Sequence, residues 1–139
     1  MKRWQAATIF FICTVLACIG VWLFEHNNEQ REKQRAAAQR QLIYESTLHS
    51  YNATLANGTA RGLVEDYLRK RGVEFNKICC LDQSKSDAEI TKIGYELGPW
   101  YCDGYEVYIG FQFSGPLGSE DPNDALKKIS IVSLPDNCL

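Results

Sequence analysis

The segment YEVYIGFQF, which runs from Tyr105 to Phe113, decides the fold class of this protein. Its odd-numbered residues are all apolar or aromatic, whereas Glu106, Gly110 and Gln112 stand at even-numbered positions. Side chains alternate between the two faces of a β-strand, so this pattern predicts a strand that buries one face. It is the clearest strand in the chain and implies a sheet around it.

Other runs on either side of this segment also have a period of two. VEFNKICCL at residues 73–81 and ALKKISIVSL at residues 125–134 both alternate, and a proline is expected to stop the second run. Residues 86–97 are ambiguous, because Ser86 and Glu89 match a helix capping box while the second half alternates like a strand. We favour an additional short strand there. The sequence therefore predicts an antiparallel sheet of three or four strands.

Two helices are predicted before these strands. The first has an apolar face at spacings of four, three and four, formed by Tyr44, Leu48, Tyr51 and Leu55. Asn57-Gly58 is typical of a helix end, and Thr59 is a suitable N-cap for a second helix over about residues 60–71. The apolar side of that helix consists of Leu63, Val64, Tyr67 and Leu68. Together they predict an αα-hairpin packed on the sheet, which makes an α+β domain over residues 44–139.

An apolar segment at residues 6–24 contains no charged residue and no proline. Nineteen helical residues span roughly 28 Å, close to the thickness of the hydrocarbon core of a bilayer. Trp4 and Trp22 stand where an aromatic belt would place them at the two membrane interfaces. We therefore expect a transmembrane helix that anchors the chain through residues 1–24, with the lipid bilayer as its first partner.

Two alternatives to an uncleaved anchor are a cleaved signal peptide and a lipoprotein signal. VLAC resembles a lipobox that would lipidate Cys18, but the chain remains apolar beyond this cysteine. Lys2 and Arg3 give a short basic N-terminus, which normally stays in the cytoplasm. We therefore expect a single-pass protein with an extracytoplasmic C-terminal domain, periplasmic if the source is bacterial.

Residues 25–43 are rich in helix-forming residues and lack an apolar stripe up to residue 41. Glu29 and Lys33 have the favourable i, i+4 order for an ion pair. This pattern predicts a solvated helical stalk between the anchor and the domain. The net charge is −2, so the composition does not indicate binding to nucleic acid.

Four cysteines follow the anchor, at Cys79, Cys80, Cys102 and Cys138. Cys102 precedes one predicted strand and Cys138 follows another, so antiparallel pairing would bring them to one end of the sheet. In an oxidising compartment we expect two structural disulfides, and bridging Cys79 and Cys80 separately to the other two avoids a vicinal ring. Free thiols and a thiol-redox or metal-handling domain are the alternatives, although C-x-x-C and zinc-ligand spacings are absent.

The stretch GPWYCDGY carries Trp100, Tyr101 and Tyr105 beside a cysteine. These aromatic residues are either an exposed recognition patch or a rim that closes the core. The adjacent carboxylates Glu65 and Asp66 diverge around their helix, so we expect them to solvate a surface. Nucleophile-elbow, P-loop, zinc-protease and dinucleotide-binding motifs are absent, so we predict a non-enzymatic protein without a cofactor, a metal or a small-molecule substrate.

The start of the second predicted helix lies between a targeting segment and an antiparallel sheet. It resembles the SmpA/BamE-type small lipoproteins of outer-membrane β-barrel assembly, and the residues that carry the resemblance are Gly58, Thr59, Val64 and Leu68. The resemblance implies an αα-hairpin on a three-stranded sheet. We expect the small α+β domain to bind or scaffold another protein of the cell envelope. The order of anchor, stalk and small β-domain is also similar to pseudopilins. The expected processing site of pseudopilins is absent from MKRWQAATIFF, so that family is a minor alternative.

Overall fold

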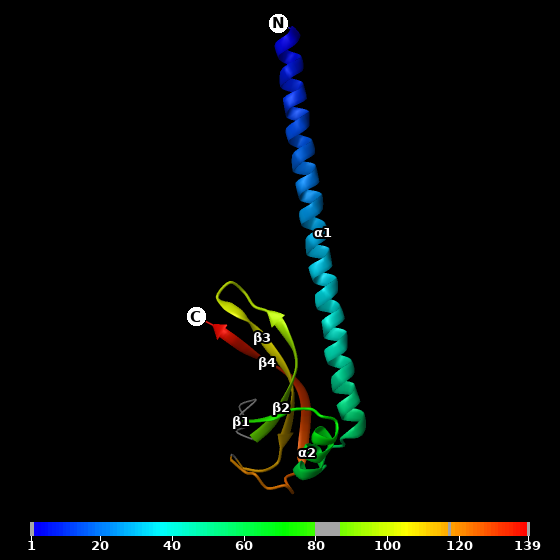
Figure 1. Ribbon diagram of the computed structural model, residues 1–139, viewed down its shortest axis with the longest axis vertical. Coiled ribbons are helices and arrows are strands. Elements are labelled where there is room, and N and C mark those ends of the chain that lie inside the picture. Colours follow the sequence, from blue (N-terminus) through cyan, green and yellow to red (C-terminus); the bar gives the residue numbers. More distant parts are fainter. Residues whose placement is uncertain (1, 80–86, 117, 139) are drawn as a thin grey trace. The chain divides into compact units, whose positions relative to one another are not determined.

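The computed structural model describes residues 2–79, 87–116 and 118–138 (Figure 1). The chain divides into two compact units, Met1–Gln41 and Leu42–Leu139. Helix α1 (Lys2–Thr54) forms the described part of the first unit and continues into the second. The predicted anchor and stalk are therefore helical.

In the first unit, the side chains of residues 16–24 are all exposed, although most of them are apolar. The Glu29 and Lys33 side chains form the expected ion pair at 2.6 Å, and both are more than half exposed. In the portion of the chain covered by the structure, no helix has the length and apolarity required for a membrane span. The transmembrane assignment of residues 6–24 stays a prediction.

The second unit contains a four-stranded antiparallel sheet in the order β1-β2-β3-β4 (Figure 1). The strands are β1 (Asn76–Cys79), β2 (Asp87–Leu97), β3 (Cys102–Phe113) and β4 (Leu126–Cys138). All three neighbouring pairs are antiparallel. The ambiguous residues 86–97 thus form a strand from residue 87 onward, which selects the four-stranded alternative.

One face of the sheet packs against helical residues. Helix α2 (Arg61–Lys70) contributes Val64 and Leu68 to the core, and the end of α1 contributes Tyr51. The odd-numbered face of β3 is buried as predicted, with Ile109, Phe111 and Phe113 completely inaccessible to solvent. Further members of this core are Leu55, Leu126 and Ile129. The predicted α+β architecture, with two helices and an antiparallel sheet, is confirmed.

A register shift between Lys92 and Gly94 interrupts the alternation of β2. Glu89 pairs with Phe111 before the shift and Gly94 pairs with Val107 after it, so both lie on the helix-covered face of the sheet. The simple alternation expected for residues 91–97 is therefore wrong after residue 92. The alternation fails because a β-bulge inserts one extra residue, so every later side chain of β2 points to the opposite face of the sheet.

Two local predictions are wrong in detail. Helix α2 has Ala60 as its N-cap, while the Thr59 hydroxyl donates instead to the Ala56 carbonyl at 2.7 Å. Strand β4 also continues through Pro135, where Tyr105 is its register partner. Proline is tolerated here because β4 is an edge strand. The N–H that proline lacks would otherwise point to solvent, where there is no further strand to accept a hydrogen bond.

Candidate functional site

An exposed aromatic surface lies at the turn between β2 and β3. Its members are Leu97, Trp100 and Tyr101, with exposed fractions of 84%, 92% and 44%, and we call it the hairpin surface. The Trp100 and Tyr101 rings meet edge to face, with centroids 5.7 Å apart. Tyr105, predicted with them, is half-buried within β3. The structure therefore brings together two of the three predicted aromatic residues and adds Leu97.

The turn that carries this surface is closely held. The Cys102 amide donates to the Pro99 carbonyl at 2.9 Å, and the Gly98 amide donates to the Asp103 carbonyl at 3.4 Å. A Cβ on Gly98 would lie 2.8 Å from the Cys102 carbonyl oxygen, so only glycine fits that close approach. The aromatic side chains thus project from an ordered turn.

Cys102 and Cys138 are register partners in β3 and β4, and they form a disulfide that closes this end of the sheet. The preferred connectivity through Cys79 and Cys80 is therefore wrong. Cys79 pairs with Asp87, at the opposite end of β2 from the turn, and strands of this length separate the two ends by roughly 30 Å. Cys79 is itself disulfide-bonded, whereas Cys80 lies outside the described residues.

Two acidic residues, Asp103 and Asp136, lie near Tyr95 of the same β-hairpin. Asp103 accepts a hydrogen bond from the Asn137 side chain at 3.0 Å, which ties the turn to the end of β4. Burial raises the pKa of the nearby Tyr95 hydroxyl, and the negative charges of Asp136 and Asp103 raise it further. The hairpin that carries the apolar hairpin surface thus also carries negative charge near Tyr95.

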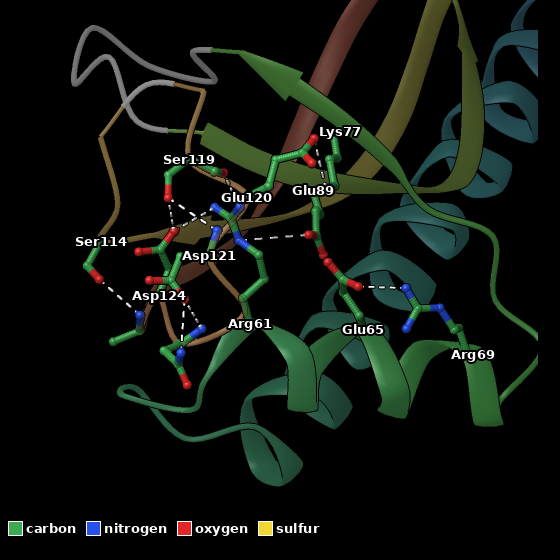
Figure 2. Close-up of polar contacts among 12 residues, drawn as sticks. Arg61, Glu65, Arg69, Lys77, Glu89, Ser114, Ser119, Glu120, Asp121 and Asp124 are labelled. Carbon is green, nitrogen blue, oxygen red and sulfur yellow. Dashed lines mark hydrogen bonds and ion pairs between the residues drawn. The ribbon is translucent and has the colours of Figure 1, made fainter.

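A second cluster, which we call the polar cluster, surrounds Arg61 at the start of α2 (Figure 2). The Arg61 side chain is only 2% exposed and its guanidinium lies 4.6 Å from the centre of the Phe113 ring. It donates to the Ser119 carbonyl and lies 3.5 Å from the Asp124 carboxylate. Ser119 also donates from its hydroxyl to Asp124 at 2.7 Å. Arg61 therefore connects α2 to the β3–β4 loop.

Glu89 of β2 faces the same cluster and is also only 2% exposed. Its carboxyl group and that of Glu65 on α2 point toward one another in Figure 2. Neither Glu89 oxygen has a hydrogen-bond donor among the described residues unless a carboxyl proton lies between the pair. Burial raises the pKa of Glu89 to about 7, and the facing Glu65 contributes to this shift. Burial acts to raise the pKa of Glu65, but its hydrogen bonds to Glu89 and Arg69 and the charges of Arg69 and Lys77 together lower it.

No pattern in the sequence predicted this polar cluster, and the adjacent Glu65 and Asp66 were both expected at a solvated surface. That expectation is wrong for Glu65, whose side chain is 17% exposed, and correct for Asp66, at 60%. A signal was nevertheless present, since Arg61 precedes Val64 and Leu68 at the three- and seven-residue spacings of one helix stripe. A charged residue in a buried stripe requires polar partners elsewhere in the fold.

A cavity of about 190 Å³ adjoins the polar cluster, lined in part by Arg61, Lys77, Glu89 and Ser119. Within the described residues, no group of three or more histidine, cysteine or acidic side chains is arranged to hold a metal ion. Comparisons of the whole chain found no matching family model, no matching curated protein and no matching solved structure.

Proposed function

We propose that this protein is a membrane-anchored, extracytoplasmic module that binds another protein through the hairpin surface, without catalysing a reaction. The observation that carries the proposal is the 92% exposure of Trp100 on an ordered turn. Exposing an indole to water is unfavourable, and tryptophan is among the residues that dominate binding energy at protein interfaces. The Cys102–Cys138 disulfide holds this turn in place, which lowers the entropic cost of binding.

The chemistry of the hairpin surface favours a protein partner over a lipid surface. Asp103 and Asp136 lie near Tyr95 of the same β-hairpin, and their charges would be repelled by an anionic membrane. A complementary protein would offer an apolar pocket for Trp100 and Leu97, with basic residues around its rim. The sequence resembles outer-membrane assembly lipoproteins, and this predicted resemblance favours a protein of the cell envelope as the binding partner.

Membrane anchoring is the second part of the proposal. Residues 16–24 expose apolar side chains on every side of α1, including Leu16, Trp22 and Phe24. A bilayer around residues 6–24 would remove this surface from water. The Cys102–Cys138 disulfide is typical of an oxidising compartment, which supports an extracytoplasmic position for residues 42–139.

Site-specific photo-crosslinking in membranes tests the protein-binding role. A photoreactive amino acid at position 100 should give a discrete protein adduct, and a substitution of Leu97 by Asp should abolish it. Position 63 is a matched control, because Leu63 is an apolar residue of α2 with 63% exposure. The adducted protein, once purified, should bind the full chain in nanodiscs, and Trp100→Ala should weaken that binding on the order of 30-fold.

The results also separate this proposal from lipid binding. An adduct of equal yield at positions 63 and 100 would contradict a specific role for the hairpin surface. Crosslinking of position 100 to lipid alone, with no protein adduct, would assign the surface to the membrane instead.

A further inference from the structure

The polar cluster holds one more acidic side chain than its basic side chains neutralise. Arg69 pairs with Glu65 at 2.6 Å, and Arg61 lies 3.5 Å from Asp124. The shortest ion-pair distance of Glu89 is 4.0 Å, to Nε of the same Arg61, which exceeds hydrogen-bond distance. Two guanidinium groups are therefore available to pair with three carboxyl groups. Glu89, the most deeply buried of the three carboxyl groups, has the longest ion-pair distance.

The other charged groups around Glu89 do not correct this imbalance. Lys77 of β1 forms an ion pair with Glu120 of the β3–β4 loop at 3.3 Å, and its charge lowers the pKa of Glu89 by less than burial and Glu65 raise it. On β2, Asp87 lines the same cavity as Glu89 and adds a further acidic group. On β3, the register partner of Glu89 is the apolar Phe111. Since a buried carboxylate without its own cation is strongly unfavourable, the favourable state of Glu89 carries a proton.

We propose that Glu65, Glu89 and Arg61 form a proton-operated clasp between α2, β2 and the β3–β4 loop. In the closed clasp, Glu89 keeps its proton and donates it in a hydrogen bond to the Glu65 carboxylate. Arg61 then stays on Ser119 and Asp124. When Glu89 releases its proton to water, Arg61 turns toward the new carboxylate and loosens its hold on the loop.

The geometry around Arg61 favours a local opening over a general unfolding. Its guanidinium reaches the loop at Ser119 and Asp124, and both contacts are lost if the side chain turns. The backbone bonds from the Arg61 amide to the Asp124 carbonyl, at 2.8 Å, and from Gly62 to Pro122, at 2.9 Å, do not depend on that side chain. The adjoining cavity gives the guanidinium room to move and admits water, which accepts the proton that Glu89 releases.

This clasp goes beyond the proposed function and does not rest on it, because the hairpin surface lies at the other end of β2 from Glu89. The pKa of Glu89 supports the mechanism: burial, reinforced by the facing Glu65, raises it to about 7. Glu89 therefore releases its proton near neutral pH, and in this pH range the loop around Ser119 would respond to small changes in pH.

Nuclear magnetic resonance on the full chain in nanodiscs tests the clasp. With ¹³Cδ-labelled glutamate and pH varied from about 5 to about 9, the Glu89 carboxyl should titrate with a midpoint near pH 7. The backbone amides of Ser119 and Asp124 should shift with the same midpoint. Exchange protection of amides in the β3–β4 loop, corrected for intrinsic rates, should fall on the order of tenfold above it.

Two variants make the result decisive. Glu89→Gln retains a donor toward Glu65 but cannot ionise, so the loop amides should cease to titrate. Glu106→Gln removes a half-buried carboxylate of β3 that pairs with Lys92, and it should leave the loop titration unchanged. Titration of Glu89 in the ordinary carboxyl range, or near pH 7 without a response of the loop amides, would overturn the proposal.

A further variant covers the case in which Glu89→Gln does not fold. Glu65→Gln removes the facing negative charge and can donate to an ionised Glu89. The Glu89 midpoint should therefore move to lower pH by about one unit or more. An unchanged midpoint in Glu65→Gln would show that the two carboxyl groups do not share a proton, which also overturns the clasp.

Discussion

Tyr44 of α1 lies against Gly94 of β2, and its hydroxyl donates a hydrogen bond to the Glu96 carboxylate at 3.1 Å. Tyr44 is 3% exposed, which makes it one of the most deeply buried residues contributed by α1. The β-bulge after Lys92 is what turns Gly94 and Glu96 toward this helix. A register irregularity in the sheet thus creates the position at which α1 docks.

Replacing Gly94 by alanine should destabilise the domain. A Cβ at this position would lie 2.6 Å from Cε1 of the Tyr44 ring, so the ring has to move and its bond to Glu96 is disturbed. We expect a loss of about 1–3 kcal/mol in the free energy of unfolding, measured by chemical denaturation. The Gly94→Ala/Tyr44→Ala double variant should lose less than the sum of the single variants, and strict additivity would contradict the contact.

The disulfide between Cys102 and Cys138 should contribute substantially to stability. It joins residues separated by 36 positions, and loop-closure entropy for such a length corresponds to about 4 kcal/mol, from which native strain subtracts. Cys138→Ser should therefore melt many degrees below the parent under oxidising conditions. Cys18→Ser is the matched control, because Cys18 is a free, exposed cysteine. Equal melting temperatures for the parent and Cys138→Ser would show that this bridge does not stabilise the fold.

The free energy of unfolding should fall as pH rises from about 4.5 to about 7. The pKa of Glu89 is raised from 4.5 to about 7, so the folded state binds an additional proton across this window. A shift of this size corresponds to a loss of about 3 kcal/mol by pH 7, and the small remainder is lost within about one pH unit above it. The pKa of Glu65 shifts downward, so its opposite contribution is complete below this window.

Glu89→Gln provides the check on this pH dependence. Denaturant unfolding measured at several pH values should show a flat profile between about pH 5 and about pH 7 in this variant and a declining one in the parent. A decline of equal slope in both proteins would assign the effect to other groups.

The orientation proposed for the chain leads to a topology prediction. A reporter fused after residue 139 should be active if it functions only outside the cytoplasm and inactive if it functions only inside. Removal of residues 1–24 should release the chain from alkali-washed membranes, because the apolar segment at residues 6–24 is the proposed anchor. The opposite reporter pattern would overturn both the localisation and the compartment argument for the disulfides.

Several features of the fold could be predicted from local sequence patterns. Alternation in residues 105–113 identified the buried face of β3, and the same pattern favoured a strand over residues 86–97. Cys102 precedes one predicted strand and Cys138 follows another, which predicted that both lie at one end of the sheet, as the structure shows. These predictions succeeded because alternation and position within a strand depend on backbone geometry, which nearby residues determine.

The polar cluster could not be derived in the same way. The sequence places Arg61 in an apolar helix stripe and Glu89 in a strand, but neither pattern states that the two side chains meet. Their contact depends on how α2 lies over β2 and on the β3–β4 loop that brings Asp124 to the same point. Exposure of Trp100 is similarly a result of tertiary packing, since the same residues could have closed the core.

By itself, the sequence determined the α+β class, the apolar N-terminal segment and the placement of Cys102 and Cys138 at one end of the sheet, because each follows from spacing along the chain. Only the tertiary structure decided which charged groups are buried and which aromatic residues face water. Burial is a property of contacts between distant segments, and the surplus buried carboxyl group at Glu89 exists only once helix, strand and loop have come together.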